Sequence, residues 1–360
     1  MEPLRLYWVV GELSGEEHAS AVIAALRSLY PHLQMRGMGG ELMAAQGVEI
    51  FIHWRDYAVV GFIEVLRNLP RFIRLYRQLK RDISEYRPHR LVLVDYPGLN
   101  LRLARWAVRQ GIGVTYFIPP QLWAWNPGRV RHLRDPRMQV LCILPFEPEF
   151  YARYGIDAQY VGHPLVERLR SVTPLKWHKP YIALLPGSRL HEVKNILPVM
   201  RGVKDLLPEW DFLVSKVAHL PEALYRQYAP DLPLIEGQTP QLLKGATAAV
   251  ITSGTATLEA ALLGVPSIIL YRGNPISYHI AKRLVRVPFI GLPNLILNEA
   301  VFPELIQSEC TASKVATALQ HQIVQADVVK SKLRRLHELL GDAPAALNAA
   351  QAVMSTLLPR

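Results

Sequence analysis

Two strand-turn-helix segments in the second half of the chain carry residues suited to binding a phosphate ester. Residues 181–185 form an apolar run that breaks at Gly187, and a helix resumes near Glu192. Such a turn presents backbone N–H groups beside the positive end of a helix dipole, where Ser188 and Arg189 would complete an anion site. Arg189 adds a planar, permanently charged fork that matches phosphate oxygens. An ordinary βα turn explains this segment about equally well.

The second segment follows further along the chain. Residues 248–252 read as a strand, then come Ser253, Gly254 and Thr255, with Glu259 on the first helical turns. A carboxylate in that place is suited to accept hydrogen bonds from the two hydroxyls of a ribose. One basic turn and one turn that carries hydroxyls and a carboxylate together indicate a nucleotide with a diphosphate.

An acidic residue ends a buried strand in the first half of the chain. Asp95 follows the apolar run 90–94 and precedes a Pro-Gly loop. The carboxyl end of a central parallel strand is where a general base would sit, and capping of the next helix is the structural alternative. His18 and His163 are the other proton carriers near predicted strand ends, and a structural role is favoured for both.

Two further loops follow predicted strands. Glu12, Ser14 and Gly15 lie in a small-residue turn that lets another molecule approach the backbone, although its spacing is not the dinucleotide fingerprint and a simple Gly turn is the alternative. Trp123 and Trp125 lie in a Pro-flanked loop, where they would stack on a sugar, flank an acyl chain or anchor the loop.

A basic and apolar stretch covers residues 59–81. Residues 51–110 hold 12 lysines and arginines against 5 acidic residues, which is most of the excess behind the formal charge of +11. Such a stretch fits a membrane interface, or an amphipathic helix packed on the sheet with a solvated basic face. A nucleic-acid groove is disfavoured, because the interleaved residues are aliphatic rather than stacking aromatics. The residues assigned to the membrane or to acyl chains are Val60, Phe62, Ile63, Leu66, Arg67, Leu69, Arg71, Phe72 and Arg74.

The bulk composition places the chain among cytosolic α/β proteins. Cys142 and Cys310 lie far apart in apolar runs, which argues against a metal box and against a disulfide framework. The apolar runs are shorter than the roughly 18 residues that a membrane span needs. The apolar N-terminus is short and reads as a first strand rather than a signal peptide.

Strands alternate with helices along the whole chain, which predicts a parallel, doubly wound sheet in each half. Among the expected helices are residues 15–29, with Ser14 as the cap, and residues 329–358. The pattern pauses in the proline-containing stretch 164–180 and then begins again. The expected domains are residues 1–170 and 171–340, with a C-terminal helix in 341–360 that the sequence leaves free to cross back to the first domain. Two such halves leave a cleft between them, with ligands at the carboxyl ends of the strands.

Taken together, these segments resemble the lipid-A-disaccharide synthase family. The match runs nearly end to end, from Gly11 to about Cys310. Nine segments in family order make it specific: Gly-Glu-Leu-Ser-Gly-Glu (11–16), Val-Val-Gly-Phe-Ile-Glu-Val-Leu (59–66), Asp-Tyr-Pro-Gly-Leu-Asn (95–100), Pro-Gln-Leu-Trp-Ala-Trp (120–125), Leu-Pro-Phe-Glu (144–147), Val-Gly-His-Pro (161–164), Leu-Pro-Gly-Ser-Arg (185–189) with Glu192, Ser-Gly-Thr-Ala-Thr-Leu-Glu (253–259) and Leu-Pro-Asn-Leu (292–295).

The resemblance implies an α/β fold of two Rossmann-like domains that face a cleft, the GT-B type. It implies an inverting glycosyltransferase that joins UDP-2,3-diacylglucosamine to 2,3-diacylglucosamine 1-phosphate through a β-1',6 bond and releases UDP. No metal or other cofactor is expected. It also implies a cytoplasmic protein held peripherally on the anionic, cytoplasmic face of the inner membrane, with a homodimer left open and nucleic acid not expected as a partner.

By position, Asp95 matches the family's essential acid, often proposed as the general base. The resemblance and the turns above together assign to the donor side Gly187, Ser188, Arg189, Glu192, Ser253, Gly254, Thr255, Glu259, Arg272 and Asn294, although the Asn294 amide would either read a uracil edge or cap a turn. They assign to the acceptor side Glu12, Ser14, Gly15, Trp123, Trp125 and His163.

Three departures from the family pattern are mild. Glu16 stands where Asp is usual, Gly98-Leu99 where Asp-Phe is frequent, and Pro119 where Ser is common. These changes would alter acyl-chain or acceptor preference. Competing interpretations are another UDP-sugar enzyme of the same fold, such as a peptidoglycan GlcNAc-transferase or a non-hydrolysing epimerase, an inactive lipid- or nucleotide-binding homologue, and a nucleic-acid-binding protein.

Overall fold

The structure, a computed structural model, describes residues 3–57, 69–125, 127–274, 278, 282–283, 285 and 287–357. The chain divides into two compact units, and each is described by itself. The first unit contains residues 1–164 and 343–360, and the second contains residues 165–342.

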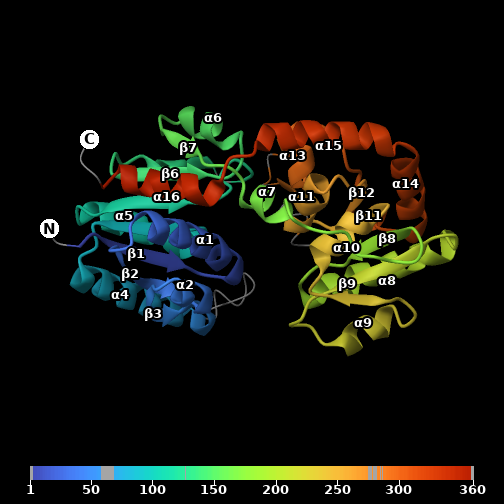
Figure 1. Cartoon of the computed structure of the whole chain (residues 1–360), viewed down its shortest axis with the longest axis horizontal. Coiled ribbons are helices and arrows are strands. Elements are labelled where there is room, and N and C mark those ends of the chain that lie inside the picture. The colour runs from blue at the N-terminus through green and yellow to red at the C-terminus, as the bar shows by residue number, and fades with distance from the viewer. Residues whose placement is uncertain are drawn as a thin grey trace. The chain divides into compact units, whose positions relative to one another are not determined.

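The first unit is built on a sheet of seven parallel strands in the order β3-β2-β1-β4-β5-β6-β7 (Figure 1). Side chains alternate between its faces, as the pleat requires: Tyr7 and Val9 of β1 enter one apolar core, and Leu6 and Trp8 enter the other. Both faces are therefore covered, as is usual for a parallel sheet. The strands are β1 (Arg5–Val10), β2 (Gln34–Gly39), β3 (Glu49–His53), β4 (Arg90–Val94), β5 (Gly113–Phe117), β6 (Met138–Cys142) and β7 (Ala158–Tyr160).

Helices cover both faces of this sheet. The C-terminal helix α16 packs beside α1, and Figure 1 shows this red helix against the blue one. Helices α4 and α5 pack on the opposite core. The helices of the unit are α1 (Leu13–Leu29), α2 (Glu41–Ala45), η1 (Trp54–Tyr57), α4 (Leu69–Tyr86), α5 (Pro97–Arg109), η2 (Pro127–Leu133), α6 (Glu147–Ala152) and α16 (Ala345–Ser355).

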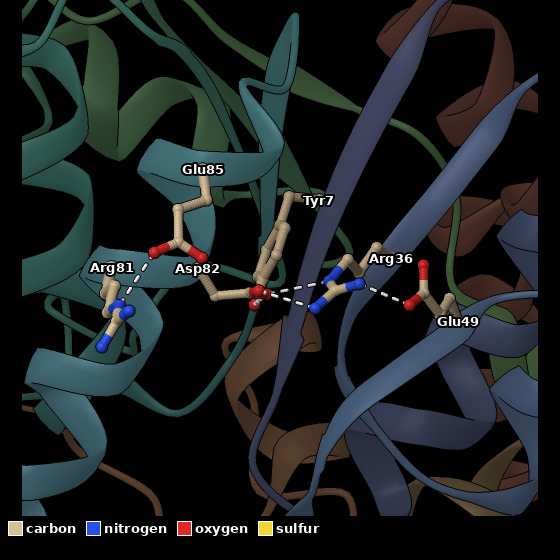
Figure 2. Close-up of polar contacts among 6 residues, drawn as sticks. All are labelled: Tyr7, Arg36, Glu49, Arg81, Asp82 and Glu85. Carbon is tan, nitrogen blue, oxygen red and sulfur yellow. Dashed lines mark hydrogen bonds and ion pairs between the residues drawn. The ribbon is translucent and has the colours of Figure 1, made fainter.

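A buried ion pair joins the basic helix α4 to the sheet (Figure 2). Asp82 of α4 accepts two bonds from the Arg36 guanidinium of β2, at 3.0 and 2.7 Å, and one from the Tyr7 hydroxyl of β1 at 2.6 Å. Arg36 also pairs with Glu49 of β3. The network therefore fixes α4 across three strands. In contrast, Arg81 and Glu85, drawn in the same view, form an exposed pair on the outer face of the helix.

The second unit repeats this plan with six parallel strands in the order β10-β9-β8-β11-β12-β13. Ile182 and Leu184 of β8 enter one core, whereas Tyr181 and Ala183 enter the other. Its strands are β8 (Tyr181–Leu185), β9 (Asp211–Lys216), β10 (Leu234–Glu236), β11 (Ala248–Thr252), β12 (Ser267–Tyr271) and β13 (Glu304–Ile306). Its helices are α7 (Pro164–Leu169), α8 (Leu190–Leu206), α9 (Glu222–Tyr228), α10 (Thr239–Gly245), α11 (Thr255–Leu262), α13 (Leu292–Leu297), η3 (Gln307–Glu309), α14 (Ala312–Val324) and α15 (Ala326–Leu340).

In each sheet the strand order reverses once, between β1 and β4 in the first unit and between β8 and β11 in the second. Ligands of doubly wound sheets bind at this switch point, outside the carboxyl ends of the strands. The predicted α/β fold with two doubly wound, Rossmann-like sheets is therefore confirmed.

Two local predictions were wrong. The helix expected over residues 329–358 is two helices, because Gly341 takes a left-handed φ of +63° and Pro344 precedes α16. The first helix begins at Leu13 with Glu12 at its N-cap, so Ser14 lies inside the helix rather than capping it. Among the helices that the structure describes, none is both long and apolar enough to cross a membrane.

Candidate active site

Asp95 lies at the carboxyl end of β4, in a backbone conformation that the surrounding residues hold in place. Its φ is +45° and that of Tyr96 is +47°, both in the left-handed region that is unfavourable for a bulky residue. The Asp95 N–H donates to the Phe117 carbonyl at 3.1 Å. The Asp95 carbonyl accepts from the Tyr116 hydroxyl and from Asn100 Nδ2, both at 2.8 Å. These bonds fix the Asp95 backbone, from which the carboxyl projects.

The environment of Asp95 makes its carboxyl a stronger base than usual. Burial raises its pKa to about 6, the Glu12 charge adds to the rise, and the Tyr96 N–H opposes it. A carboxylate with this pKa is largely ionised at pH 7, yet it takes a proton more readily than an exposed one.

Glu12 belongs to the loop after β1, the strand beside β4 at the switch point. Its carboxylate accepts the Ser14 hydroxyl at 2.5 Å. Gly11 permits the close packing of the two loops, because a Cβ there would lie only 2.3 Å from Cγ of Tyr96. Gly15 is buried, and a Cβ there would lie 3.2 Å from Cγ1 of Val10, which is a tight contact. The structure thus brings Glu12 close enough for its charge to act on Asp95.

Trp123 anchors its loop. The indole N–H donates to Glu147 at 3.1 Å, and the ring meets Phe146 edge to face at 5.0 Å. Burial raises the pKa of Glu147 to about 7, against the indole and two backbone N–H groups that favour the charged form. Sequence reasoning quoted Glu147 as part of a motif and gave it no role. Its signal was an acid at the start of α6, in the segment that follows β6 at the same sheet edge as Asp95.

The other two predicted acceptor residues differ in exposure. Trp125 is exposed, and the Arg129 guanidinium stands 5.5 Å from its ring centre. His163 is buried and follows β7, which β5 and β6 separate from β4. At the usual strand spacing this places β7 about 14 Å from β4, so the structure does not bring His163 beside Asp95.

The Glu16 carboxylate, one of the departures noted above, is committed to the fold. It is fully buried and accepts from the N–H groups of Leu42 and Met43 at 2.9 and 3.1 Å, and from the Trp54 indole at 2.6 Å. The carboxylate therefore holds α2 and η1 against α1, and faces the interior.

In the second unit, the turn after β8 has the geometry of an anion site and is filled by a carboxylate. Gly187 has a φ of +102°. Glu192 accepts from the N–H groups of Ser188 and Arg189 at 2.9 and 3.1 Å, and pairs with Arg189 Nη1 at 3.0 Å. His219 of the loop after β9 donates to the Ser188 carbonyl at 2.8 Å. The donors that the sequence assigned to a phosphate thus exist, and Glu192 occupies two of them.

The turn after β11, the other strand at this switch point, exposes Gly254 and Thr255 at the start of α11. The Ser253 hydroxyl donates to the Ile290 carbonyl at 3.4 Å. Glu259 is buried and pairs with Arg168 of α7, a partner that sequence reasoning missed. A ribose would therefore have to share the Glu259 carboxylate with Arg168.

Arg272 follows β12 and lines a hollow of about 810 Å³ in the second unit. His191 and Asn195, on the first turns of α8, line its other side, next to the Gly187 turn. This volume lies within the 300–1,000 Å³ that is typical of small-molecule sites.

Asn294 is fully buried and is used by the fold. Its Nδ2 donates to the Phe302 carbonyl at 2.8 Å and to Glu304 at 2.9 Å, and its Oδ1 accepts the Phe302 N–H at 2.9 Å. Glu304, which sequence reasoning missed, also accepts the N–H groups of Ile290 and Gly291. Both N–H groups of the amide are therefore committed, which agrees with the structural alternative rather than with reading a uracil edge.

The predicted membrane surface is described only in part. Val60, Phe62, Ile63, Leu66 and Arg67 lie outside the described residues, and Leu69 is the first residue of α4.

In the described part of this surface, Phe72 is half-buried, whereas Arg71 and Arg74 are exposed. Phe72 packs against Tyr96, with ring centres 6.1 Å apart. Arg71 binds the Asp56 carbonyl and covers the Tyr57 ring, whereas Arg74 is exposed beside Ile73. Phe72 thus connects the basic helix to the Asp95 loop.

The chain matches the lipid-A-disaccharide synthetase family over residues 6–353, which is almost its whole length. It belongs to the lipid-A-disaccharide synthase family. The prediction made from the nine segments is therefore confirmed. The chain is a glycosyltransferase, and membership of this family implies lipid-linked sugar substrates.

Individual members of the family align with nearly all of this chain. The lipid-A-disaccharide synthase of Myxococcus xanthus is 37% identical over 377 residues, which cover 99% of this chain and 98% of that protein. The enzyme of Acidobacterium capsulatum is 38% identical over 342 residues, covering 88% and 86%.

Solved structures share the fold with this family member at low identity. The glycotransferase of kitacinnamycin superposes with a TM-score of 0.67 at 15% identity, over 100% of both chains. The UDP-GlcNAc 2-epimerase of Neisseria meningitidis, bound to UDP-GlcNAc, gives 0.59 at 12% identity, over 98% and 99%. These likenesses place the chain in the GT-B fold.

Proposed function

We propose that this lipid-A-disaccharide synthase joins UDP-2,3-diacylglucosamine to 2,3-diacylglucosamine 1-phosphate in one displacement that inverts the anomeric carbon. The observation that carries the proposal is the Asp95 carboxyl, fixed at the switch point with its pKa raised to about 6. Asp95 takes the proton of the acceptor 6-hydroxyl as that oxygen attacks C1 of the donor sugar. The C1–O bond to UDP breaks, and the electron pair leaves with the diphosphate.

The second unit supplies groups for the departing charge. Arg189 and the N–H groups of Ser188 and Arg189 face the diphosphate once Glu192 has turned away, and Arg272 lines the hollow beside them. Donors placed in advance where negative charge develops lower the barrier without reorganising during the reaction. On this account the reaction proceeds without a metal cofactor.

Both substrates are lipids, so the enzyme has to work at a membrane surface. We place it peripherally on the anionic cytoplasmic face of the inner membrane, with the basic helix α4 toward the headgroups. The exposed Arg74 and Ile73 of α4 support this arrangement, because a mixed basic and apolar face binds anionic interfaces.

The test is release of UDP by the purified protein in neutral detergent micelles, with both lipids and with each lipid alone. Release that requires both lipids and yields the disaccharide would support the reaction. Asp95→Asn should lower kcat about 10²–10⁴-fold, since it removes the base, while UDP binding changes little. Turnover within a few fold of the wild type would eliminate Asp95 as the base.

A further inference from the structure

A basic pocket that the proposed displacement does not use lies between α5 and η2 of the first unit. Its volume is about 240 Å³. Every charged or titratable residue that lines it, within the described part of the chain, is a base. The lining residues are Pro97, Gly98, Leu101, Arg102, Arg105, Arg129 and His132.

Two of the three arginines in this pocket contact neutral groups. Arg102 Nη1 donates to the Gly98 carbonyl at 2.8 Å, and Arg129 stands over the Trp125 ring at 5.5 Å. Neither contact cancels the positive charge, in contrast to Arg36, which carboxylates neutralise. Burial lowers the pKa of His132, and the neighbouring arginines, Arg105 foremost, lower it further. The pocket therefore holds a concentrated positive charge.

The pocket lies close to the proposed base. Gly98 follows Asp95 by three residues, so their Cα atoms are at most about 11 Å apart. A Cβ built on Gly98 meets no atom within 4 Å, so the backbone at the start of α5 is open to a ligand.

We propose that this pocket binds the 1-phosphate of the acceptor lipid while the acceptor 6-hydroxyl lies at Asp95. The inference rests on the proposed function and adds to it a residue set for the acceptor. Guanidinium forks match phosphate oxygens in paired hydrogen bonds, and three of them line the pocket. One glucosamine ring carries both the 1-phosphate, which this pocket would hold, and the 6-hydroxyl, which reacts at Asp95.

Steady-state kinetics in neutral micelles, with the acceptor varied at saturating donor, test the proposal. Arg105→Gln should raise the acceptor KM at least about tenfold, the loss of a charged hydrogen bond, and leave the affinity for UDP unchanged. Arg109→Gln removes the same charge from the same helix outside the pocket, and should change the acceptor KM less than about twofold. An equal rise in both variants would overturn the proposal.

An acceptor that lacks the 1-phosphate identifies the group that is bound. With diacylglucosamine as the acceptor, the wild type and Arg105→Gln should have equally high acceptor KM values, because the contact that distinguishes them is gone. If the pocket instead binds bulk anionic headgroups, the Arg105→Gln defect would appear only on anionic vesicles and would persist with the dephosphorylated acceptor. A wild type that turns over both lipids, with an Arg105→Gln variant of unchanged acceptor KM, would reject the pocket and leave the reaction standing.

Discussion

The Glu192 carboxylate accepts a hydrogen bond from the backbone N–H of Ser188 at 2.9 Å. It therefore occupies the turn after β8, where we place the diphosphate of UDP. The same carboxylate caps the first turn of α8. A phosphate entering this turn must displace it, and the two negative charges repel each other. The residue therefore stabilises the free protein at some cost to nucleotide affinity.

Glu192→Gln should separate these two effects. A neutral amide is a weaker acceptor and does not repel phosphate, so we expect the Kd for UDP to fall about three- to tenfold. The free energy of unfolding should fall by about 0.5–1 kcal/mol, because α8 loses a charged cap. Titration calorimetry measures the Kd for UDP, and urea unfolding measures the free energy of unfolding. Glu209→Gln, in the exposed loop after α8, is the control. Weaker UDP binding by Glu192→Gln would contradict the competition between Glu192 and the diphosphate.

The pH dependence of turnover should follow the ionisation of Asp95. The base has to be deprotonated, so kcat/KM should rise with pH and reach half its maximum near the Asp95 pKa of about 6. Glu12→Gln removes one of the two causes of the raised pKa and should move this limb to lower pH. It should not reach the ordinary value of 3.8, because burial is the larger cause.

The control for this shift is Glu17→Gln, which removes an exposed acid from α1, the helix that begins directly after Glu12. Its pH profile should coincide with that of the wild type. A Glu12→Gln profile that also coincides with the wild type would show that Glu12 does not act on Asp95.

The raised pKa of Asp95 also predicts a stability effect. The folded protein holds this proton more tightly than the unfolded chain, so the unfolded chain ionises first and stability is lost as pH rises through about 6. The difference between this pKa and the ordinary value of 3.8 corresponds to about 3 kcal/mol in the free energy of unfolding. Asp95→Asn should therefore be more stable than the wild type by up to about 3 kcal/mol at pH 8, and by little at pH 4. Urea unfolding at the two pH values checks the sign, and a less stable variant at pH 8 would refute it.

Two of the ion pairs in Figure 2, Arg36–Asp82 and Arg81–Glu85, should differ sharply in their contribution to stability. Asp82→Asn leaves the half-buried Arg36 without its main counter-charge, which should lower the free energy of unfolding by about 3 kcal/mol. Glu85→Gln breaks the exposed pair with Arg81 on the same helix and should cost less than about 0.5 kcal/mol. Thermal unfolding of the two variants side by side makes the comparison, and similar losses would contradict the buried network as the anchor of α4.

Local sequence patterns were enough to predict the strands and turns that carry the candidate site. Apolar runs that end at Asp95, Gly187 and Ser253 placed these residues after β4, β8 and β11, because a strand buried on both faces has a continuous apolar signal. Short edge strands were harder. β13 has three residues and no distinctive run, so Glu304 and its bonds to Asn294 were not foreseen.

Contacts between residues distant in sequence could not be read from such patterns. Arg168 and Glu259 are 91 positions apart, and only the folded unit brings them together. The filling of the Gly187 turn by Glu192 was missed for a different reason. Spacing places an acid on the first helical turn, but it does not tell whether that acid faces a ligand or its own backbone.

The packing of α16 on α1 has a consequence for how the protein is made. The first unit is interrupted in the chain: residues 165–342 are synthesised before its last helix, which contributes Ala350 and Val353 to the core over α1. During translation the second unit can therefore complete its core while the first still exposes the apolar face that α16 will cover. A chain from which α16 is missing would leave this apolar face exposed, and exposed apolar surface of this kind makes incompletely folded chains prone to aggregation.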